Sequence, residues 1–495
     1  MKLSHFQENI INEFKNSDKN IIIQAVPGSG KTTTLLELLK HVDTKKSAIF
    51  LAFNKSIVDE LSKKITNKQI QVSTIHSLGC KSIFAEKQGK VKINNYKIFI
   101  LAKSIQEEFQ YKRKKRLTMY INNLIDIVNF YRINNCKDYD EIDRLIDYYN
   151  IPVFGKESED AKLLLDKYFS YNKKHLNSGI EIEIDFVDMI YMPINYDFEL
   201  YKYDYIFIDE CQDLNICQQL LINKLKHKKT RFVAVGDKYQ CIFNFAGADM
   251  SSYDNLMNSE NTIQLPLNYS YRCGQTIIDK AKKLYDVIED NPNIHEGEVI
   301  ELYENFNDIN IIKEGDFVLC RNTMPLIQLY FMLIQEKKKA YIYGSDMGKG
   351  VMQIYNIVKG KDINTIKNNC EKLLSDLYQQ LVEQGVKKPL LHNRYAKLQE
   401  QIDIIRFVLK RNKLENVEKV INELFSDNNK TGIRLMTMHK SKGLEADNVF
   451  ILNDYLCPSK YTKTKEELIS EKNLLYVAIT RAKKKLYFID FELEK

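Results

Sequence analysis

Hydrophobic positions along the chain fall into short unbroken runs and longer helical patterns. The runs at 20–23 (NIII), 205–208 (YIFI) and 232–235 (FVAV) are rich in β-branched and aromatic residues, which is typical of buried strands. Apolar residues recur with helical spacing at 35–39 and with heptad-like spacing at 393–411, which is typical of helices. The chain is therefore expected to contain both buried strands and helices.

The first strand-like run leads into a glycine turn and then a helical pattern. The segment NIIIQAVPGSGKTTTLLELLK (20–40) has the strand–loop–helix context that a phosphate-binding P-loop requires. Its glycines let backbone N–H groups close around phosphate oxygens, its lysine can reach the β- and γ-phosphates, and a threonine can hold Mg²⁺. The residues predicted to bind the nucleotide here are Pro27, Gly28, Ser29, Gly30, Lys31, Thr32 and Thr33.

A second strand-like run ends in two adjacent acids. In YDYIFIDECQD (203–213), Asp209 and Glu210 follow the run directly. Paired acids at strand ends are often only solvated turn residues. In a P-loop protein they instead fit a metal ligand and a base, so we assign Asp209 to Mg²⁺ and Glu210 to activation of the attacking water.

Length and composition describe an ordinary soluble protein of several domains. The 495 residues are too many for one core and predict two to four domains. The longest apolar runs, such as LIQLYFMLI, are far shorter than the roughly 20 residues that a membrane span needs. Nine cysteines show no CxxC pair, which indicates a reducing compartment and no metal site of cysteines. We therefore expect a cytoplasmic protein without a membrane partner.

The net charge of +7 suits a nucleic-acid partner without establishing one. The densest basic cluster is YKRKKR at 111–116. It can be a solvated helix face, a contact to the DNA backbone, or a localisation signal.

The segment VGDKYQCIFNFAGAD (235–249) has an unusual composition. A strand-like start ends at Asp237, and Gln240, Phe243 and Phe245 follow among small and polar residues. Two phenylalanines that are two positions apart would ordinarily be core residues on one face of a strand.

Taken in order along the chain, these and further motifs resemble superfamily 1A helicases of the UvrD/Rep/PcrA type. The resemblance runs from about residue 3 to 485. It includes HFQENII at the start, VSTIHSLG from 72, LNYSYRC ending at 273, LMTMHKSKGLEADNVF from 435 and EKNLLYVAITRAKKKL from 471. Eight such motifs in the family's order leave little room for chance.

The resemblance implies roles at the nucleotide. Gln7 would read the adenine edge of ATP, Gln240 would sense the γ-phosphate, and Glu445 would meet the ribose. Arg272 and Arg481 resemble two arginines that clamp the γ-phosphate. Tyr271 resembles the ring that stacks on the base, but Ser270 stands where the family has an asparagine, so Tyr269 remains an alternative. The implied cofactors are ATP and Mg²⁺.

The resemblance also implies contacts to single-stranded DNA. Phe243 and Phe245 resemble paired aromatics between which bases slot, and such stacking is indifferent to base sequence. The further strand contacts implied are Phe53, Thr74, His76 and His439. A lone histidine is more often a structural residue or a cap, and that reading stays open for His76 and His439.

The order of the motifs in the resemblance implies an α/β fold of two RecA-like P-loop domains with parallel sheets, each carrying a mainly helical insertion. We expect domain 1A at 1–85 and 199–270, insertion 1B at 86–198, domain 2A at 271–345 and 431–495, and insertion 2B at 346–430. An insertion 2B of this length is short for the family and is similar to that of small phage- or virus-type members.

The implied function is ATP-dependent 3′–5′ movement on single-stranded DNA and its junctions with duplex, in DNA repair or replication. A monomer in solution is expected, located in the cytoplasm or, alternatively, at the nucleoid or a viral replication site. Two alternatives stay open: a translocase that strips proteins with little unwinding, and an ATP-switched DNA-binding accessory protein.

Overall fold

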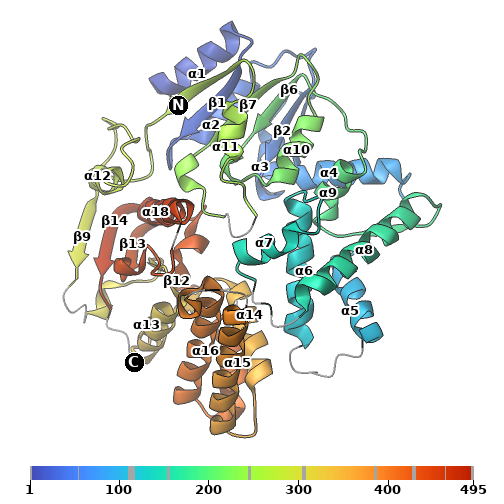
Figure 1. Cartoon of the computed structure of the whole chain (residues 1–495). Helices are drawn as coiled ribbons and strands as arrows, with labels where there is room; N and C mark the ends of the chain where they lie inside the picture. The colour runs from blue at the N-terminus through green and yellow to red at the C-terminus, as the bar shows by residue number, and fades with distance from the viewer. Residues whose placement is uncertain are drawn as a thin grey trace. The chain divides into compact units, whose positions relative to one another are not determined.

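A computed structural model describes residues 3–53, 55–109, 117–151, 153, 156–243, 247–303, 308–383, 386, 388–425, 431–462 and 464–491. The chain divides into two compact units, one built mainly from residues up to Tyr271 and one from Arg272 onward. Each unit contains a six-stranded sheet whose neighbouring strands are all parallel (Figure 1). The predicted α/β class with parallel sheets is confirmed.

The sheet of the first unit has the strand order β3-β2-β6-β7-β1-β8. The three predicted strand segments all lie in this sheet, and β6, β7 and β1 are neighbours in it. Its strands are β1 (Asn20–Ala25), β2 (Ala48–Ala52), β3 (Ile70–Thr74), β6 (Tyr205–Ile208), β7 (Arg231–Gly236) and β8 (Thr262–Leu267). Because all are parallel, their carboxyl ends meet along one edge of the sheet, where ligands bind in folds of this class.

Helices of the first unit pack onto this sheet through an apolar core. The core combines strand residues such as Ile21 and Phe207 with Leu35 and Leu38 of the helix that follows the P-loop. The helices that follow or precede the strands are α1 (His5–Asn16), α2 (Lys31–Leu39), α3 (Lys55–Lys64), α4 (Ile75–Glu86), α10 (Ile216–Lys224) and α11 (Ser252–Met257).

A mainly helical segment follows α4 in the first unit. It contains a two-stranded parallel sheet and a small core, which includes Val91, Ile182 and Met192 and also takes in Ile83 of α4. Its elements are β4 (Val91–Ile93), α5 (Lys97–Phe109), α6 (Leu117–Ile133), α7 (Glu141–Tyr148), α8 (Glu157–Leu176), β5 (Ile182–Ile184) and α9 (Asp188–Asn195). The predicted basic cluster at 111–116 lies outside the described residues.

The sheet of the second unit has the order β11-β12-β10-β13-β14-β9. Its strands are β9 (Glu298–Leu302), β10 (Phe317–Cys320), β11 (Ala340–Ile342), β12 (Ile433–Thr437), β13 (Ala446–Leu452) and β14 (Ala482–Ile489). The helices α12 (Gln275–Lys282), α13 (Thr323–Gln335) and α18 (Lys465–Ile479) belong to the same unit. A threonine–glutamate capping box begins α18 at Thr464, so the local sequence determines where this helix starts.

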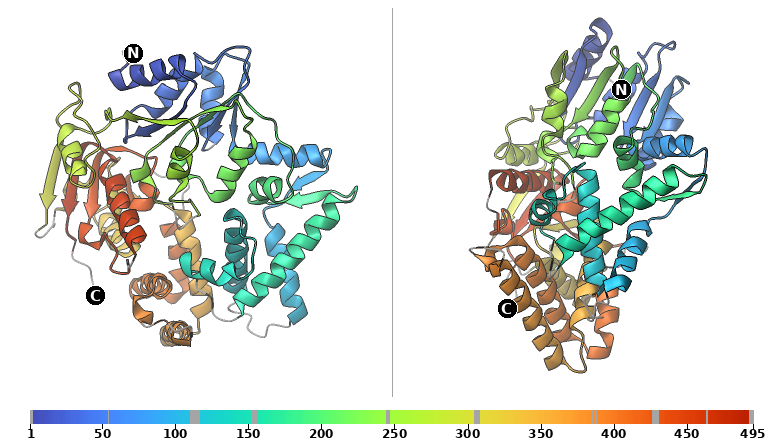
Figure 2. Two further views of the ribbon diagram at one scale, coloured as in Figure 1. Left: turned by 45° about the horizontal axis from the view of Figure 1, so that its top comes forward. Right: turned by 45° about the vertical axis from the view of Figure 1, so that its right-hand side comes forward.

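Four more helices of the second unit lie between β11 and β12 in the chain. They are α14 (Ser345–Val358), α15 (Ile363–Glu383), α16 (Asn393–Arg411) and α17 (Val417–Leu424). Figure 2 shows them beside one another, and α16 packs against the other three. The bounds of α16 are those of the segment with heptad-like spacing, so this helix was predictable from its pattern. Among the described residues, no helix combines the length and apolarity needed to cross a bilayer.

Candidate functional site

The phosphate-binding turn lies at the carboxyl end of β1. Gly28 and Gly30 have φ angles of +71° and +82°, a left-handed backbone that costs little only for glycine. The N–H of Ser29 donates to the carbonyl of Val26 at 3.2 Å, which tightens the turn. Because α2 begins directly afterwards at Lys31, the N–H groups of its first turn face the same space.

Three hydroxyl groups of this turn have no hydrogen-bond partner within the described ranges. Ser29 Oγ is buried and unpaired, and the half-buried Thr32 and Thr33 make no side-chain hydrogen bond there either. A buried hydroxyl without a partner costs about 1–3 kcal/mol. The turn therefore fits a polar ligand that supplies the missing partners.

The two predicted acids follow β6, and Glu210 lies against the P-loop lysine. Lys31 Nζ and Glu210 Oε1 are 2.8 Å apart. Glu210 has a φ of +49°, which is uncommon for a residue with a side chain and occurs where the surrounding structure enforces it. The structure thus brings together Lys31, Asp209 and Glu210, as predicted.

Burial and like charge make this group of acids hold protons more tightly than usual. Burial, followed by the charge of Glu210, raises the pKa of Asp209 to about 6. Burial also raises the pKa of Asp237 to about 6, and the nearby Lys31 and Gln240 oppose that shift. A divalent cation beside Asp209 would reverse the penalty, so the oxygens of Asp209 and Thr32 fit a Mg²⁺ site.

Hydrogen bonds continue from Glu210 to the predicted phosphate sensor. Gln212 Nε2 donates to Glu210 Oε2 at 2.6 Å, and Gln212 Oε1 accepts from the N–H of Asp237 at 3.0 Å. Gln240 Nε2 then donates to Asp237 Oδ2 at 2.8 Å. We call this series, Lys31–Glu210–Gln212–Asp237–Gln240, the polar relay.

The polar relay depends on a close approach at Gly236, the last residue of β7. A Cβ atom there would lie 2.5 Å from Gln212 Oε1 and 2.7 Å from Cys211 Sγ. Only glycine therefore leaves room for Gln212 between the ends of β6 and β7. Gln24 at the end of β1 adds a donor, Nε2, 3.3 Å from Asp237 Oδ1.

Gln7, the predicted adenine reader, packs over the start of α2. Its Oε1 accepts from the N–H of Ser4 at 3.0 Å, and its Nε2 donates to Thr34 Oγ1 at 3.1 Å. Its amide nitrogen would lie 3.6 Å from a Cβ at Gly30. Gln7 is therefore beside the P-loop, with its amide already engaged by the protein.

The structure distinguishes the two tyrosines that the sequence left as alternatives. Tyr269 packs its ring edge-on against His5 and Phe6, with centroids 5.2 and 4.9 Å away. Tyr271 is 41% exposed, and its N–H donates to the carbonyl of Gly28 at 2.9 Å. Tyr271 thus combines an accessible ring with a direct bond to the P-loop, which favours it over Tyr269.

In the second unit, Arg272 and Glu445 lie together. Arg272 Nε is 2.6 Å from Glu445 Oε2, and Lys483 Nζ is 2.7 Å from Glu445 Oε1. Burial would raise the pKa of Glu445, but the two cations hold it below its usual value. This carboxylate is therefore ionised and held between two positive charges.

Arg481 lies at the end of α18 and is only 1% exposed. Its guanidinium donates to the carbonyls of Val477 and Leu444 at 2.9 and 3.2 Å, and to Thr480 Oγ1 at 3.2 Å. These bonds to groups of its own unit fix the side chain. Its predicted role at the γ-phosphate stays a prediction.

The predicted strand contacts of the first unit follow β2 and β3, at the same edge of the sheet as the P-loop. Phe53 is 52% exposed, and Thr74 caps α4 by accepting from the N–H of Ser77. The ring of His76 packs on Phe186, with centroids 4.6 Å apart. Burial lowers the pKa of His76 to about 4, so this imidazole is neutral at physiological pH.

The remaining predicted strand contacts lie further along the chain. Phe243 is half-buried and follows Gln240 by three positions, whereas Phe245 lies outside the described residues. In the second unit, burial and then the charge of Arg321 lower the pKa of His439 to about 3. Neutral histidines offer a ring and a hydrogen bond to a strand, rather than a positive charge.

Comparison with known families agrees with this arrangement. Residues 3–261, just over half of the chain, match the UvrD/REP helicase N-terminal domain. Residues 432–489 match the UvrD-like helicase C-terminal domain.

The chain belongs to the UvrD/Rep helicase family. Its similarity to superfamily 1A proteins, inferred from the motifs, is thereby confirmed.

Relatives of this helicase-family chain come from eukaryotes and bacteria. It is 27% identical to F-box DNA helicase protein 1 of Schizosaccharomyces pombe, over 99% of this chain and 57% of the relative. It is 24% identical to F-box DNA helicase 1 of Gallus gallus, over 98% and 48%. It is 22% identical to ATP-dependent DNA helicase Rep of Buchnera aphidicola subsp. Schizaphis graminum, over 99% and 93%. The chain thus spans about half the length of the two F-box relatives.

Sequence reasoning missed four residues of this helicase-family site. Gln24, Gln212 and Asp237 join the phosphate-binding turn to Gln240, and Phe186 packs on His76. Two of them gave a signal: Gln212 follows the acid pair by two positions, and Asp237 ends a strand-like run. Gln24 and Phe186 gave none, because only the folded chain reveals their neighbours.

Proposed function

We propose that this protein is an ATP-dependent DNA helicase or translocase that moves 3′ to 5′ along single-stranded DNA. The observation that carries the proposal is the polar relay. It joins Lys31 in the P-loop to Gln240, three residues before the aromatic Phe243. A change at the γ-phosphate would therefore reach a DNA-binding segment through groups that are already in contact.

At the nucleotide, each residue would have a distinct task. Lys31 and the N–H groups of the turn would hold the phosphates, and Glu210 would accept the proton of the attacking water. Mg²⁺, held by Thr32 and Asp209, would neutralise charge on the phosphates. Tyr271 would stack on the base, and Gln7 would select adenine.

Arg272, Arg481 and Glu445 would complete the site from the second unit, in a cleft between two RecA-like domains. When ATP binds, the guanidinium of Arg272 would leave the Glu445 carboxylate and pair with the γ-phosphate, so one anionic partner would replace another. Delocalised guanidinium charge facing the transferred phosphoryl group is worth about 10³–10⁵ in rate. The division into 1A, 1B, 2A and 2B at the boundaries given above is part of this proposal.

Single-stranded DNA would lie along the sheet edge that carries Phe53, Thr74 and His76, with Phe243, Phe245 and His439 as further contacts. The exposed ring of Phe186 extends that surface. The fit of several aromatic rings to unpaired bases supports a track without sequence preference. Junctions with duplex DNA would be the natural substrate, and the protein would act as a monomer.

Assays of ATP hydrolysis and of unwinding test the proposal and separate it from its alternatives. Hydrolysis that single-stranded DNA stimulates excludes an ATP-switched accessory protein. Unwinding of a 3′-tailed duplex, but not of a 5′-tailed one, supports the helicase. Protein displacement without unwinding would instead indicate the stripping translocase, which a short insertion 2B favours. Absence of DNA-stimulated hydrolysis would disprove the proposal.

Binding of Mg²⁺ with nucleotide should weaken as the pH falls through about 6. The pKa of Asp209 is raised to about 6, so below that pH the carboxyl is protonated and must lose a proton to meet a cation. The raised pKa also contributes to the free energy of unfolding of the nucleotide-free protein. That stabilising contribution is complete below pH ~4 and is lost as the pH rises through about 6. Calorimetry at pH 5–8 should show the affinity falling by up to about tenfold per unit on the acid side.

The control for this pH dependence is Glu210→Gln. Loss of the neighbouring charge lowers the pKa of Asp209, so the acid midpoint should move to lower pH. The nucleotide's own phosphates titrate equally in both proteins, and the difference between the two therefore reports on Asp209. An unchanged midpoint would contradict the assignment of Asp209 to the metal.

The combined change Phe243→Ala and Phe245→Ala should abolish the stimulation of ATP hydrolysis by DNA. Each lost stack is worth about 1–3 kcal/mol per base, so affinity for single strands should fall roughly 5- to 150-fold per ring. Titration of hydrolysis with oligothymidine measures both effects. Tyr201→Ala, at an exposed ring before β6, serves as the control. Full stimulation in the double variant would show that these rings do not grip DNA.

A further inference from the structure

The turn between β5 and α9, which we call the corner, carries an exposed aromatic ring between two buried aspartates. Phe186 is 55% exposed, whereas Asp185 and Asp188 on either side are buried. The ring lies against His76, with centroids 4.6 Å apart. An exposed apolar ring next to a predicted contact to single-stranded DNA is accessible to a ligand.

The two aspartates close the corner on each other. The N–H of Asp188 donates to Asp185 Oδ1 at 2.7 Å, and the N–H of Asp185 donates to Asp188 Oδ2 at 3.1 Å. These reciprocal bonds span the two residues between them, one of which is Phe186. The direction in which the Phe186 side chain leaves the backbone is thereby fixed.

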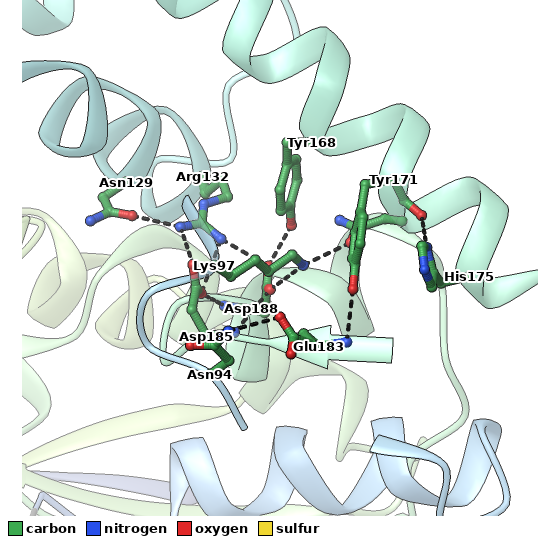
Figure 3. A network of polar contacts seen from close by, with 11 residues as sticks. Asn94, Lys97, Asn129, Arg132, Tyr168, Tyr171, His175, Glu183, Asp185 and Asp188 are labelled. Atoms are coloured by element: carbon green, nitrogen blue, oxygen red, sulfur yellow. Dashed lines mark hydrogen bonds and ion pairs between the residues drawn. The ribbon is translucent and has the colours of Figure 1, made fainter. Parts of the chain in front are cut away.

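Two buried cations hold these carboxylates in place, as Figure 3 shows. Arg132 from α6 donates to both oxygens of Asp185, at 3.0 and 2.8 Å, and to Asp188 Oδ1 at 2.8 Å. Lys97 from α5 lies 2.6 Å from Asp188 Oδ2. Tyr168 from α8 donates its hydroxyl to Asp188 Oδ1 at 2.5 Å. Three helices of the insertion thus converge on one corner.

Stability alone gives little reason for such a network. Burial would raise the pKa of Asp188, but Lys97 and Arg132 hold it below its usual value, so two positive and two negative charges are buried together. Replacing a buried network of this kind by apolar residues is often neutral or stabilising. What ionic groups with many directional bonds do provide is a single geometry.

The other side of the corner is fixed as well. Gly79, on the helix that carries His76, lies so close to α9 that a Cβ there would be 1.7 Å from the carbonyl oxygen of Met189. The helices α4 and α9 are therefore in backbone contact one turn away from the His76–Phe186 pair. The backbone segments that carry the two rings are therefore held close together.

We propose that Lys97, Arg132 and Tyr168 are positioning residues that hold Phe186 against His76 as a rigid platform for an unpaired base of single-stranded DNA. The inference rests on the proposed function and deepens its DNA-binding site. A ring that is ordered before binding loses no conformational freedom on stacking, so more of the stacking energy appears as affinity. Residues of the insertion would then affect the affinity for single-stranded DNA without contacting the DNA themselves.

A double-mutant cycle between Phe186→Ala and Lys97→Met tests the proposal. Affinity for a fluorescein-labelled oligothymidine is measured by anisotropy at one fixed salt concentration. Loss of one stack should weaken binding roughly 5- to 150-fold in Phe186→Ala. Lys97→Met should cause most of that loss. The double variant should bind within about twofold of Phe186→Ala, since positioning has no value once the ring is gone.

Two further variants separate positioning from general loosening. Lys87→Met removes another buried ammonium of the same region, one whose Nζ donates to the carbonyls of His175 and Ser178, and it should leave affinity within about twofold of wild type. Tyr168→Phe removes a single oxygen atom and is the milder change, so it serves as the test if Lys97→Met does not fold. It should weaken binding in the same direction and lose that effect in the Phe186→Ala background.

Three results would overturn the inference. The first is a loss of affinity in the double variant equal to the product of the two single losses. The second is a loss of affinity in Lys87→Met as large as that in Lys97→Met. The third is unchanged affinity in Phe186→Ala. In each case a wild-type protein that binds DNA and hydrolyses ATP in response leaves the proposed function standing. A wild-type protein that does neither would instead refute the function itself.

Discussion

Lys31→Ala should reduce the rate of ATP hydrolysis by about 10³-fold or more while single-stranded DNA binding persists. The side chain is the cation of the P-loop, 2.8 Å from Glu210 and close to Asp209 and Asp237. Burial alone would lower its pKa, but these acids raise it, so the ammonium stays charged and available to the phosphates. Removing one preorganised donor from a developing negative charge costs about 10²–10³ in rate, and here a full charge is lost as well.

The loss should extend beyond the phosphate contact. When Lys31 is removed, Asp209, Glu210 and Asp237 lose a cation that offsets their charges, so affinity for nucleotide should also fall. Steady-state hydrolysis and binding of a fluorescent nucleotide measure the two effects separately. Lys40→Ala is the matched control, because that lysine ends the same helix, is exposed and pairs only with Glu37 among the described residues. Near-normal hydrolysis in Lys31→Ala would remove the P-loop from the mechanism.

Glu210→Gln should slow hydrolysis by about 10²–10⁴-fold while nucleotide binding is retained or strengthened. A positioned general base contributes a factor of that size, and the amide cannot accept the proton of the attacking water. The neutral side chain has nearly the same shape and still offers an oxygen to Gln212 Nε2, which lies 2.6 Å from the present carboxylate. Loss of a negative charge beside the phosphates favours binding.

Single-turnover hydrolysis and calorimetry together test this second expectation. Glu60→Gln is the control, since Glu60 is exposed on α3 and pairs with Lys64. A wild-type rate in Glu210→Gln would mean that another group accepts the proton, and Asp237, with its raised pKa, would be the next to examine. Weaker nucleotide binding would point instead to collapse of the polar relay.

The local parts of the site were predictable because each depends on a few neighbouring residues. Gly28 and Gly30 permit the left-handed turn, and the leucines that follow produce a helix with one buried face. The acids after β6 and the helix α16 were read from runs and spacings in the same way. Hydrophobic periodicity and backbone freedom are short-range properties, so they can be read directly from the chain.

Pairings between distant residues were not predictable in this way. Gln212 meets Asp237, and Phe186 meets His76, across 25 and 110 positions of the chain. The sequence around each of these residues does not indicate which distant residue it contacts. The motif assigned Tyr271 and left Tyr269 as an alternative, and only the structure shows that Tyr269 packs against Phe6 whereas the ring of Tyr271 is exposed.

The amino-acid sequence by itself therefore determined the family, the phosphate-binding turn and the two acids. The tertiary structure decided how these parts are connected. The order β6–β7–β1 within a parallel sheet brings three carboxyl ends together, and a glycine at the end of the middle strand leaves space for Gln212 between them. A hydrogen bond needs its partner within about 3 Å, and for residues far apart in the chain only the fold determines that distance.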